Sequence, residues 1–189
     1  MPIKKCLAVL AVGALVCWVM LGLRTQAAAP QKAELGGSSV TKAIGQLIPT
    51  TKTESKVKGT VTFTLTGNKM HVYGEISGLT PGEHGFHVHE FGVWNEDGMA
   101  TGGHFNPSGE HHAGHDSARR HVGDMGNIKA DANGVATVDL DDDLMSFSGT
   151  NSILGRGLVV HEKADDLKSD PSGNAGGRLA VAIIGVAKP

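Results

Sequence analysis

Histidine is the residue type with the clearest chemical potential in this chain, which contains ten of them. His87 and His89 alternate with Phe86 and Val88, so on a β-strand the two imidazoles point to one face and the apolar side chains to the other. Two imidazoles on the outer face of a strand provide half of a metal site. Because a His-x-His pair also arises by chance, this spacing alone is a weak indication of metal binding.

The long segment 91–124 has no strand pattern and supplies further residue types that bind metals. Its four strongest candidates are His104, His112, His121 and Asp124. Three imidazoles with one carboxylate form a reasonable tetrahedral set for zinc. His161 follows the apolar run 158–160, and an all-imidazole set would suit a copper ion that changes oxidation state. The histidines therefore favour metal chemistry over any other kind of site.

The segments that position these residues alternate with the period of β-strands. Strands are predicted in 57–65, 70–76, 86–89, 128–130, 136–140, 157–161 and 178–186. The dipeptide Asn133-Gly134 lies between two alternating runs and predicts a hairpin. The sequence thus indicates an all-β sandwich or barrel. Its two long loops, 91–124 and 162–177, are where function is expected.

The N-terminal part of the chain is typical of an export signal. Lys4 and Lys5 precede an apolar run over 6–23, and small residues follow at 27–29. We expect residues 1–29 to be a signal peptide that directs the protein to the periplasm or the extracellular space. The apolar run could almost span a bilayer, so an uncleaved membrane anchor is the alternative.

Residues 30–56 show no sustained period and are expected to form a flexible linker before a domain over 57–189. The formal net charge is -2 and no long charge run is present, so a nucleic-acid partner is not indicated. Both cysteines, Cys6 and Cys17, lie in the predicted signal. The exported domain is therefore expected to contain no disulfide and, after cleavage, to have no membrane contact.

Several blocks of the sequence resemble the signature blocks of the Cu/Zn superoxide dismutase family, in the order in which that family has them. The blocks are GFHVHEFG (85–92), HFNP (104–107), RHVGD (120–124), LVVHE (158–162) and GNAGGRLA (173–180). The resemblance covers the chain from Val57 to the C-terminus and is closer to the eukaryotic-type branch. It implies an eight-stranded Greek-key β-barrel, immunoglobulin-like in architecture, with metals outside the barrel under two loops.

The resemblance also implies an activity, the conversion of superoxide to oxygen and hydrogen peroxide, and the residues that carry it. His87, His89, His104 and His161 would bind copper, and His104, His112, His121 and Asp124 would bind zinc. His104 would bridge both ions and supply a proton, and Arg178 would attract and orient the anion. Asp165 would link His87 to His112 through their outer nitrogens. The alternative function is that of an exported copper- and zinc-binding protein without catalysis.

The chain departs from the family at its usual disulfide, where the matching positions are Gly98 and Val181. We expect Trp94 and Met99 to anchor the loop over 92–103 by apolar contacts instead, with Val181 filling the space. The resemblance further implies a homodimer, whose contact surface would lie around 153–155 and 184–186 together with Gly92.

Overall fold

The computed structural model describes residues 40–188, which form strands joined by turns and loops, with one short 3₁₀ helix, η1 (Met99–Thr101). The strands are β1 (Lys42–Pro49), β2 (Lys58–Thr66), β3 (Lys69–Ser77), β4 (Gly82–His89), β5 (Asp124–Ala130), β6 (Val135–Asp142), β7 (Gly157–His161), β8 (Arg178–Ile183) and β9 (Gly185–Val186). The signal expected over 1–29 lies outside the described residues. Within 40–188, no helix has the length and apolar character needed to cross a membrane.

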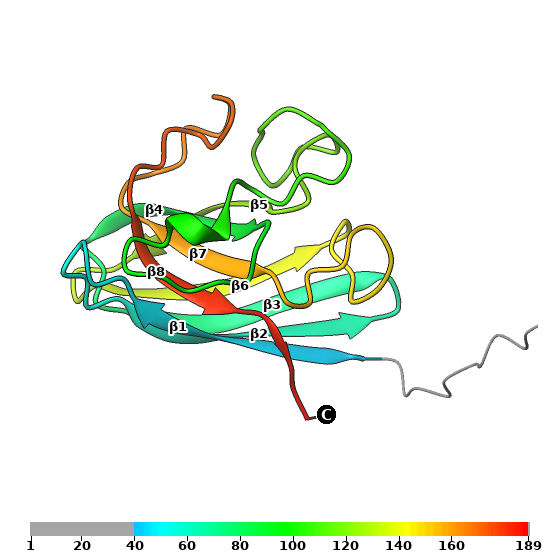
Figure 1. The fold of residues 1–189 in the computed structure, drawn as a ribbon, viewed down its shortest axis with the longest axis horizontal. Coiled ribbons are helices and arrows are strands. Elements are labelled where there is room, and N and C mark those ends of the chain that lie inside the picture. The colour runs from blue at the N-terminus through cyan, green and yellow to red at the C-terminus, as the bar shows by residue number, and fades with distance from the viewer. Residues whose placement is uncertain (1–39, 189) are drawn as a thin grey trace, which may run out of the picture. The chain divides into compact units, whose positions relative to one another are not determined.

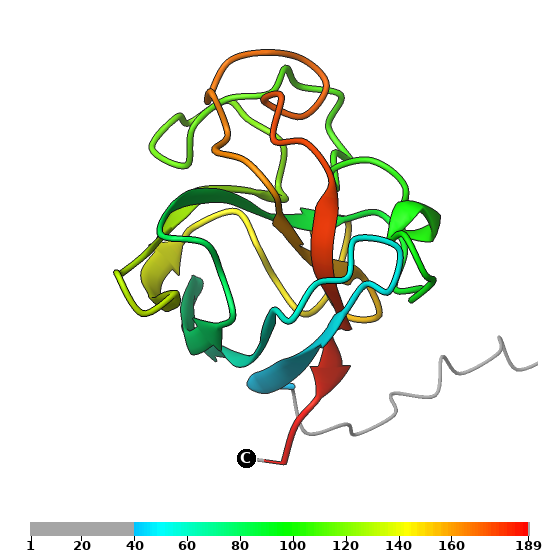
Figure 2. The same ribbon diagram turned by 90° about the vertical axis from the view of Figure 1, so that its left-hand side faces the viewer.

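The strands pair antiparallel in the order β5-β4-β7-β8-β1-β2-β3-β6, and β9 also pairs with β1. The two ends of this path, β5 and β6, are consecutive in the chain, so the sheet curls until its ends nearly meet (Figure 2). The order passes directly from β4 to β7 and from β3 to β6, as long Greek-key connections require. The predicted all-β, eight-stranded barrel is confirmed.

The barrel interior is filled by every second side chain of its strands. In β3, Met70, Val72 and Ile76 are fully buried, whereas Tyr73 on the opposite face is 54% exposed. Phe63 of the neighbouring strand β2 is also fully buried. Because burying a large apolar side chain typically contributes about 1.5–3 kcal/mol, this interior provides the rigid base on which the loops rest.

Strand β1 corrects the prediction from sequence, because it lies within the linker expected over 30–56. Ala43 and Leu47 face the core, while Ile44 and Ile48 face outward with exposed fractions of 39% and 51%. Two large apolar side chains on the outer face hide the alternation that normally reveals a strand. β1 pairs with β2 on one side and β8 on the other, so it is part of the barrel rather than a tether.

The Asn133-Gly134 turn is present, but the predicted hairpin is wrong. Gly134 has the positive φ of 75° that this tight turn requires, and Asp131 Oδ1 accepts hydrogen bonds from the backbone N–H groups of Asn133 and Val135. The strands before and after the turn nevertheless pair elsewhere, β5 with β4 and β6 with β3. The turn residues fix a local bend, whereas the strand partners are decided by burial.

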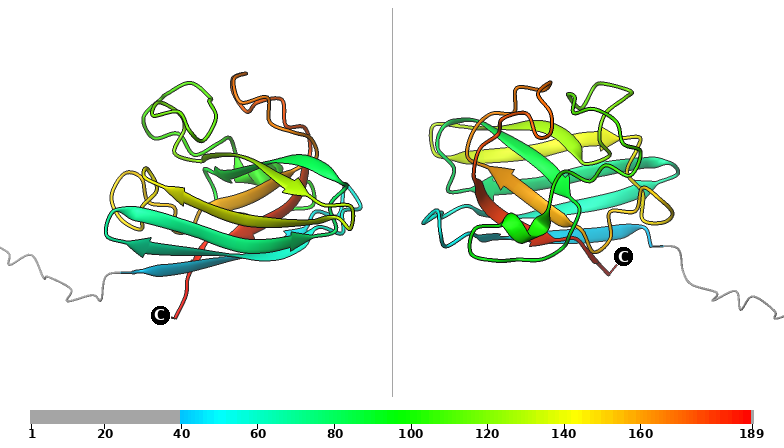
Figure 3. Two further views of the ribbon diagram at one scale, coloured as in Figure 1. Left: turned by 180° about the vertical axis from the view of Figure 1, so that it is seen from behind. Right: turned by 45° about the horizontal axis from the view of Figure 1, so that its top comes forward.

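Two long loops rise on one side of the barrel, as Figures 1 and 2 show for 106–123 and 162–177. The other side, seen in Figure 3, is the broad sheet of β1, β2, β3 and β6. A buried ion pair joins the first loop to β6, with Arg120 Nη2 donating to Asp142 Oδ2 over 2.6 Å. Arg120 Nη1 also donates to the carbonyl oxygen of His121 over 3.0 Å, which fixes the loop next to a candidate ligand.

Replacing Leu47 with alanine tests whether β1 belongs to the core. Leu47 is 3% exposed, and removing a buried leucine side chain typically costs about 2–5 kcal/mol. We expect Leu47→Ala to lower the free energy of unfolding by this amount in urea denaturation followed by circular dichroism. Gln46→Ala, on the outward face of the same strand, is the control and should change it by less than about 0.5 kcal/mol. Unchanged stability of Leu47→Ala would mean that this segment is a linker after all.

Candidate metal centre

Strands β4 and β7 carry three histidines of the site. His87 and His89 lie on the outer side of β4, whereas the neighbouring Phe86 and Val88 belong to the core. β7 pairs directly with β4 and ends in His161, whose ring centroid lies 5.3 Å from that of His89. The three imidazoles are almost completely buried, so the loops cover them. Their positions are set by the sheet, which is more rigid than a loop.

The first long loop brings His104 to this group by pairing with the end of β4. His104 forms an isolated β-bridge with His89, and the backbone N–H of Phe105 donates to the carbonyl oxygen of Val88 over 2.8 Å. The ring centroids of His104 and His87 are consequently 4.0 Å apart. A residue distant in sequence thus reaches the outer face of the barrel through backbone hydrogen bonds.

Asp124, the first residue of β5, lies between three histidines that belong to the first long loop. Its Oδ1 atom lies 2.8 Å from His104 Nδ1, 3.1 Å from His112 Nδ1 and 3.2 Å from His121 Nδ1. The contact with His112 is close but does not have the geometry of a hydrogen bond. Three ring nitrogens converging on one carboxylate oxygen create a site that is ready for a cation.

Two sets of four residues satisfy the distance requirement for sharing an ion, since one ligand atom from each residue lies within 4.8 Å of the others. The sets are His87, His89, His104 and His161, and His104, His112, His121 and Asp124. His104 belongs to both. The structure therefore brings together all the residues that were predicted from the sequence as metal ligands, in the two groups expected.

Asp165 in the second loop connects the two sets. Its Oδ2 atom accepts from His87 Nε2 and its Oδ1 atom accepts from His112 Nε2, both over 2.8 Å. Because each Nε2 then donates its hydrogen to Asp165, the Nδ1 atoms of His87 and His112 are the ring nitrogens left to bind a metal. Asp165 is itself held by Asn127, whose Oδ1 accepts from the backbone N–H of Asp165 over 2.7 Å.

Burial lowers the pKa of the histidines in the all-imidazole set. Desolvation is the main cause for His89 and His161, where neighbouring histidines and the charge of Arg178 lower the pKa further. Burial also lowers the pKa of His87, and it lowers that of His104 to about 4 even though Asp124 opposes the shift. These rings are therefore neutral near pH 7, which is the form that coordinates metals.

His112 lies between two carboxylates and shifts in the opposite direction. Burial lowers its pKa, but the close contact with Asp124, the hydrogen bond to Asp165 and the charges of both carboxylates outweigh burial and raise the pKa to about 10. The same contacts hold the pKa of both carboxyl groups well below the usual range, although desolvation acts to raise it. The two carboxylates therefore stabilise a positive charge at His112, and either a proton or a bound metal ion can supply that charge.

The donor set passes a direct test of fit for metal ions. His87 Nδ1, His104 Nε2 and His112 Nδ1 are buried and have no hydrogen-bond partner among the described residues. Since buried polar atoms are normally paired, lone pairs directed into a shared space fit metal coordination. The all-imidazole set suits copper, and the set with one carboxylate suits tetrahedral zinc.

Arg178 opens β8 directly opposite His161 in the sheet register. Its guanidinium group donates three hydrogen bonds to the first loop: Nη1 to Gly98 O over 2.6 Å and to Thr101 Oγ1 over 2.8 Å, and Nη2 to Gly102 O over 2.7 Å. These contacts use three of the five N–H donors of an arginine. The positive charge lies near enough to His89 and His161 to lower the pKa of both.

The apolar anchors expected for the loop over 92–103 are wrong, because Trp94 and Met99 are 37% and 61% exposed. Polar contacts hold the loop instead. Asp97 Oδ1 accepts from Asn95 Nδ2 and from the backbone N–H of Met99, and the backbone N–H of Lys52 donates to the carbonyl oxygen of Glu96 over 2.9 Å.

The two positions that match the family's usual disulfide, Gly98 and Val181, lie against each other in the structure. Val181 is buried as expected, and a side chain on Gly98 would lie 3.1 Å from it and 2.9 Å from Arg178 Cβ, so the two positions pack without a disulfide. Thr101 and Asn127 were not anticipated, because a single threonine or asparagine outside a motif resembles any solvent-facing residue in the sequence.

The remaining histidines lie outside both sets. His84 is buried, and its ring nitrogens contact the carbonyl oxygens of His161 and Thr80, which gives it a structural role. His71 and His111 each contact an aspartate at the surface. His115 is partly buried against Asp142.

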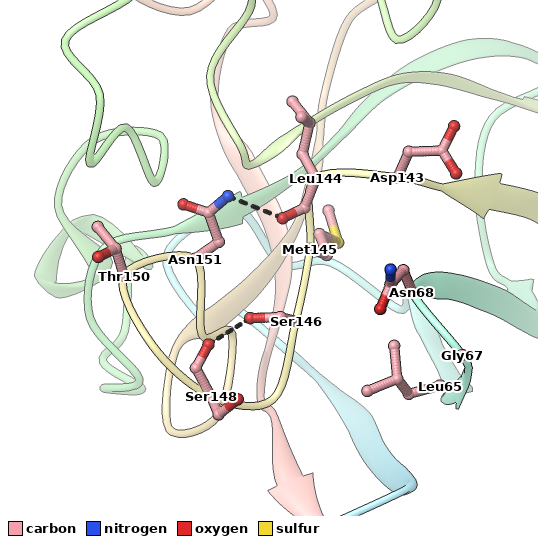
Figure 4. Close-up of a pocket in the computed structure, with 10 residues that line it drawn as sticks. All are labelled: Leu65, Gly67, Asn68, Asp143, Leu144, Met145, Ser146, Ser148, Thr150 and Asn151. Atoms are coloured by element: carbon pink, nitrogen blue, oxygen red, sulfur yellow. Dashed lines mark hydrogen bonds between the residues drawn. The ribbon is translucent and has the colours of Figure 1, made fainter.

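An open pocket elsewhere on the molecule has different chemistry. Figure 4 shows it between the β2–β3 turn and the loop after β6, lined by hydroxyl, amide and aliphatic groups with a single carboxylate, that of Asp143. None of the residues that line it belongs to either metal-ligand set. This pocket is therefore separate from the site where the ionisable groups gather.

Two adjacent histidine-rich centres on the outside of a Greek-key barrel define a β-barrel protein with paired metal sites. The chain belongs to the copper/zinc superoxide dismutase (SODC) family, whose model matches residues 57–184.

Relatives and a solved structure support this membership. The chain is 42% identical over 154 residues to the extracellular superoxide dismutase [Cu-Zn] of Drosophila melanogaster, covering 77% of this chain and 85% of that protein. It is 42% identical over 140 residues to the extracellular superoxide dismutase [Cu-Zn] of Caenorhabditis elegans, covering 71% of this chain and 63% of that protein. The crystal structure of the clock protein EA4 is 45% identical with a TM-score of 0.73, covering 80% of this chain and 98% of that chain.

Replacing Asp165 with asparagine tests the connection between the two ligand sets. An amide cannot accept from both imidazoles as a carboxylate does, and loss of such partners typically weakens metal affinity by about 10–100-fold. We expect Asp165→Asn to show this loss in competition with a chromogenic chelator. Asp166→Asn is the matched control, because Asp166 caps the same loop at the surface and contacts neither ligand set. Equal affinities of the two variants would contradict the role of Asp165.

Proposed function

We propose that this protein is a superoxide dismutase that converts two superoxide ions and two protons to oxygen and hydrogen peroxide. In this proposal His87, His89, His104 and His161 hold copper, and His104, His112, His121 and Asp124 hold zinc. The observation that carries it is the pair of four-residue sets that share His104 on a chain whose relatives bear that name. Copper would supply a centre that accepts and returns one electron, whereas zinc has no redox chemistry.

The role of Arg178 follows from its charge and its contacts. Superoxide is an anion, and a guanidinium group is permanently charged and offers several donors in fixed geometry. Three hydrogen bonds to the first loop fix the Arg178 group beside His161 and leave donors to orient the substrate. We assign attraction and orientation of the anion to this residue.

Proton supply is assigned to His104. Its Nδ1 atom faces Asp124 over 2.8 Å, and its Nε2 atom is buried without a partner among residues 40–188. That nitrogen can hold a proton on the side facing the all-imidazole set and release it to the reduced substrate. Asp165 and Asp124 keep the surrounding rings in a single orientation while this proton moves.

A metal buffer without catalysis would need the same two ligand sets, but it would have no use for an anion-binding group. The half-buried guanidinium of Arg178, with its acceptors built into the first loop, therefore favours the enzyme. Export is the second part of the proposal, since the two relatives named above are called extracellular and the N-terminal sequence has the order of a signal.

We also propose a homodimer, with a contact surface that keeps Val186 from the region expected from sequence and otherwise lies on neighbouring strands. Ile153 and Ile184 are fully buried within the protomer and cannot contact a partner. The outward-facing apolar side chains of β1, β8 and β9 are more suitable: Ile44, Ile48, Ile183 and Val186, with exposed fractions of 39%, 51%, 49% and 63%. β8 and β9 each pair with β1, so the side chains lie on adjoining strands and form a patch that a twofold axis can cover with its own copy.

Substituting a copper ligand tests the activity. The wild type loaded with copper and zinc should remove superoxide in a cytochrome c competition assay, and metal analysis should find both ions. His161→Ala should lose copper and at least about 100-fold in activity, because an open redox centre with the wrong ligands no longer cycles. His71→Ala, at the surface of β3, is the control and should behave as the wild type. A wild type that holds both metals without activity would favour the buffer.

Introducing a charge into the patch tests the dimer. We expect the wild type to have the mass of two chains in light scattering, and Ile48→Lys to have that of one, because an unpaired lysine at an apolar contact is costly to desolvate. Tyr73→Lys, on the exposed face of β3, should remain dimeric. A wild type of single-chain mass at micromolar concentration would exclude this part of the proposal.

A further inference from the structure

Thr101 lies at a point where the first loop, the anion-orienting arginine and a histidine of the copper set meet. Its side chain is fully buried in η1. The Oγ1 atom lies 3.0 Å from the carbonyl oxygen of Gly98, 2.8 Å from Arg178 Nη1 and 3.3 Å from His89 Nδ1. No other hydroxyl group of the described residues contacts both Arg178 and a member of the ligand sets.

The hydrogen-bond roles at this hydroxyl are fixed by its neighbours. A carbonyl oxygen only accepts and a guanidinium only donates, so Thr101 donates to Gly98 and accepts from Arg178. Its second lone pair is then available to the N–H at His89 Nδ1, which also donates to the carbonyl oxygen of Gly102 over 3.1 Å. The one donor and both acceptor positions of the hydroxyl group are thereby used.

The methyl group of Thr101 holds the hydroxyl in this orientation. A side chain on Gly157 of β7 would lie 3.0 Å from Thr101 Cγ2, so the methyl packs against the bare backbone of that strand. A β-branched side chain is also stiff at χ1. Threonine therefore combines a fixed hydroxyl direction with packing against the barrel.

We propose that Thr101 is a positioning residue whose hydroxyl couples the guanidinium of Arg178 to the ring of His89 and anchors the loop at the place where no disulfide forms. The inference rests on the functions proposed above for Arg178 and His89. It explains how Gly98, which cannot form a covalent link, still presents its carbonyl oxygen to Arg178: Thr101 and Arg178 hold that oxygen together.

Removing the hydroxyl should disturb anion binding beyond any effect on folding. Without Thr101 Oγ1, one N–H of Arg178 Nη1 loses its acceptor and the N–H of His89 keeps only Gly102. The guanidinium then has freedom to turn away from the anion position, and the His89 ring has freedom to tilt. Both changes are visible in the copper-loaded protein, through its affinity for an anion and through its copper spectrum.

The experiment uses the full chain loaded with copper and zinc, with azide as the anionic probe. Thr101→Val keeps the shape of the side chain and removes only the hydroxyl. We expect its azide dissociation constant, from titration of the copper absorption bands, to rise by about tenfold, similar to the lower end of the effect that loss of an outer hydrogen-bond partner has on metal affinity or activity. Its Cu(II) electron paramagnetic resonance parameters should also change, whereas Thr101→Ser should retain values close to the wild type.

Thr50→Val is the matched control for stability. Thr50 is also fully buried, and its hydroxyl contacts the backbone carbonyl oxygens of Arg178 and Leu179 rather than the guanidinium. It should lose stability to a similar degree while keeping the azide affinity of the wild type. If Thr101→Val does not fold, comparison of Thr101→Ser with Thr101→Ala isolates the hydroxyl in the same way.

Azide affinity and copper spectra of Thr101→Val that equal those of the wild type, or a loss matched by Thr50→Val, would overturn the proposal. Superoxide removal by the wild type is measured in parallel. A wild type without activity but with a Thr101-dependent azide affinity would contradict the proposed function while leaving the positioning role intact.

Discussion

Two buried carboxylates, Asp124 and Asp165, impose the constraint on which the rest of the site depends. Their side chains have no exposed surface, and a buried carboxylate is tolerated only when positive charge and hydrogen bonds surround it. Each is contacted by two or three imidazoles, and these contacts keep both groups ionised despite burial. The negative charge fixes which nitrogen of His87 and of His112 carries hydrogen, and so fixes where lone pairs remain. The hydrogen bonds that the imidazoles donate to the two carboxylates therefore also determine which ring nitrogens can bind a metal.

The same contacts hold the loops to the barrel. Asp165 from the second loop bonds His87 on β4 and His112 on the first loop, so the three segments share one carboxylate. The pair of Arg120 and Asp142 adds a second buried link between the first loop and β6. In a domain without cysteines, such links perform the work of a covalent bond. Metal binding and loop order should accordingly be coupled, since every ligand set joins residues from separate elements.

The sequence predicted most of the barrel and both ligand sets, because alternation and ligand chemistry leave direct traces in residue types. It failed where the deciding property was tertiary. β1 escaped because Ile44 and Ile48 face outward while small residues such as Ala43 face the core. The hairpin at Asn133-Gly134 was wrong because a turn specifies a bend and not the partner strands. Thr101 could not be identified because its role depends on contacts with Gly98, Arg178 and His89, which only the fold brings together.

The net charge of this protein differs in sign from the charge of Arg178. The chain has a formal net charge of -2, and β6 and the residue after it carry a row of carboxylates at Asp139, Asp141 and Asp143, so the protein as a whole does not attract an anion. In the function proposed above, attraction of the anion is assigned to Arg178, whose charge is half-buried and hence less screened by solvent than that of a surface lysine. A short-range field of this kind depends steeply on where the guanidinium lies. The acceptors of the first loop, above all the hydroxyl of Thr101, therefore matter more to the chemistry than the number of cations on the surface.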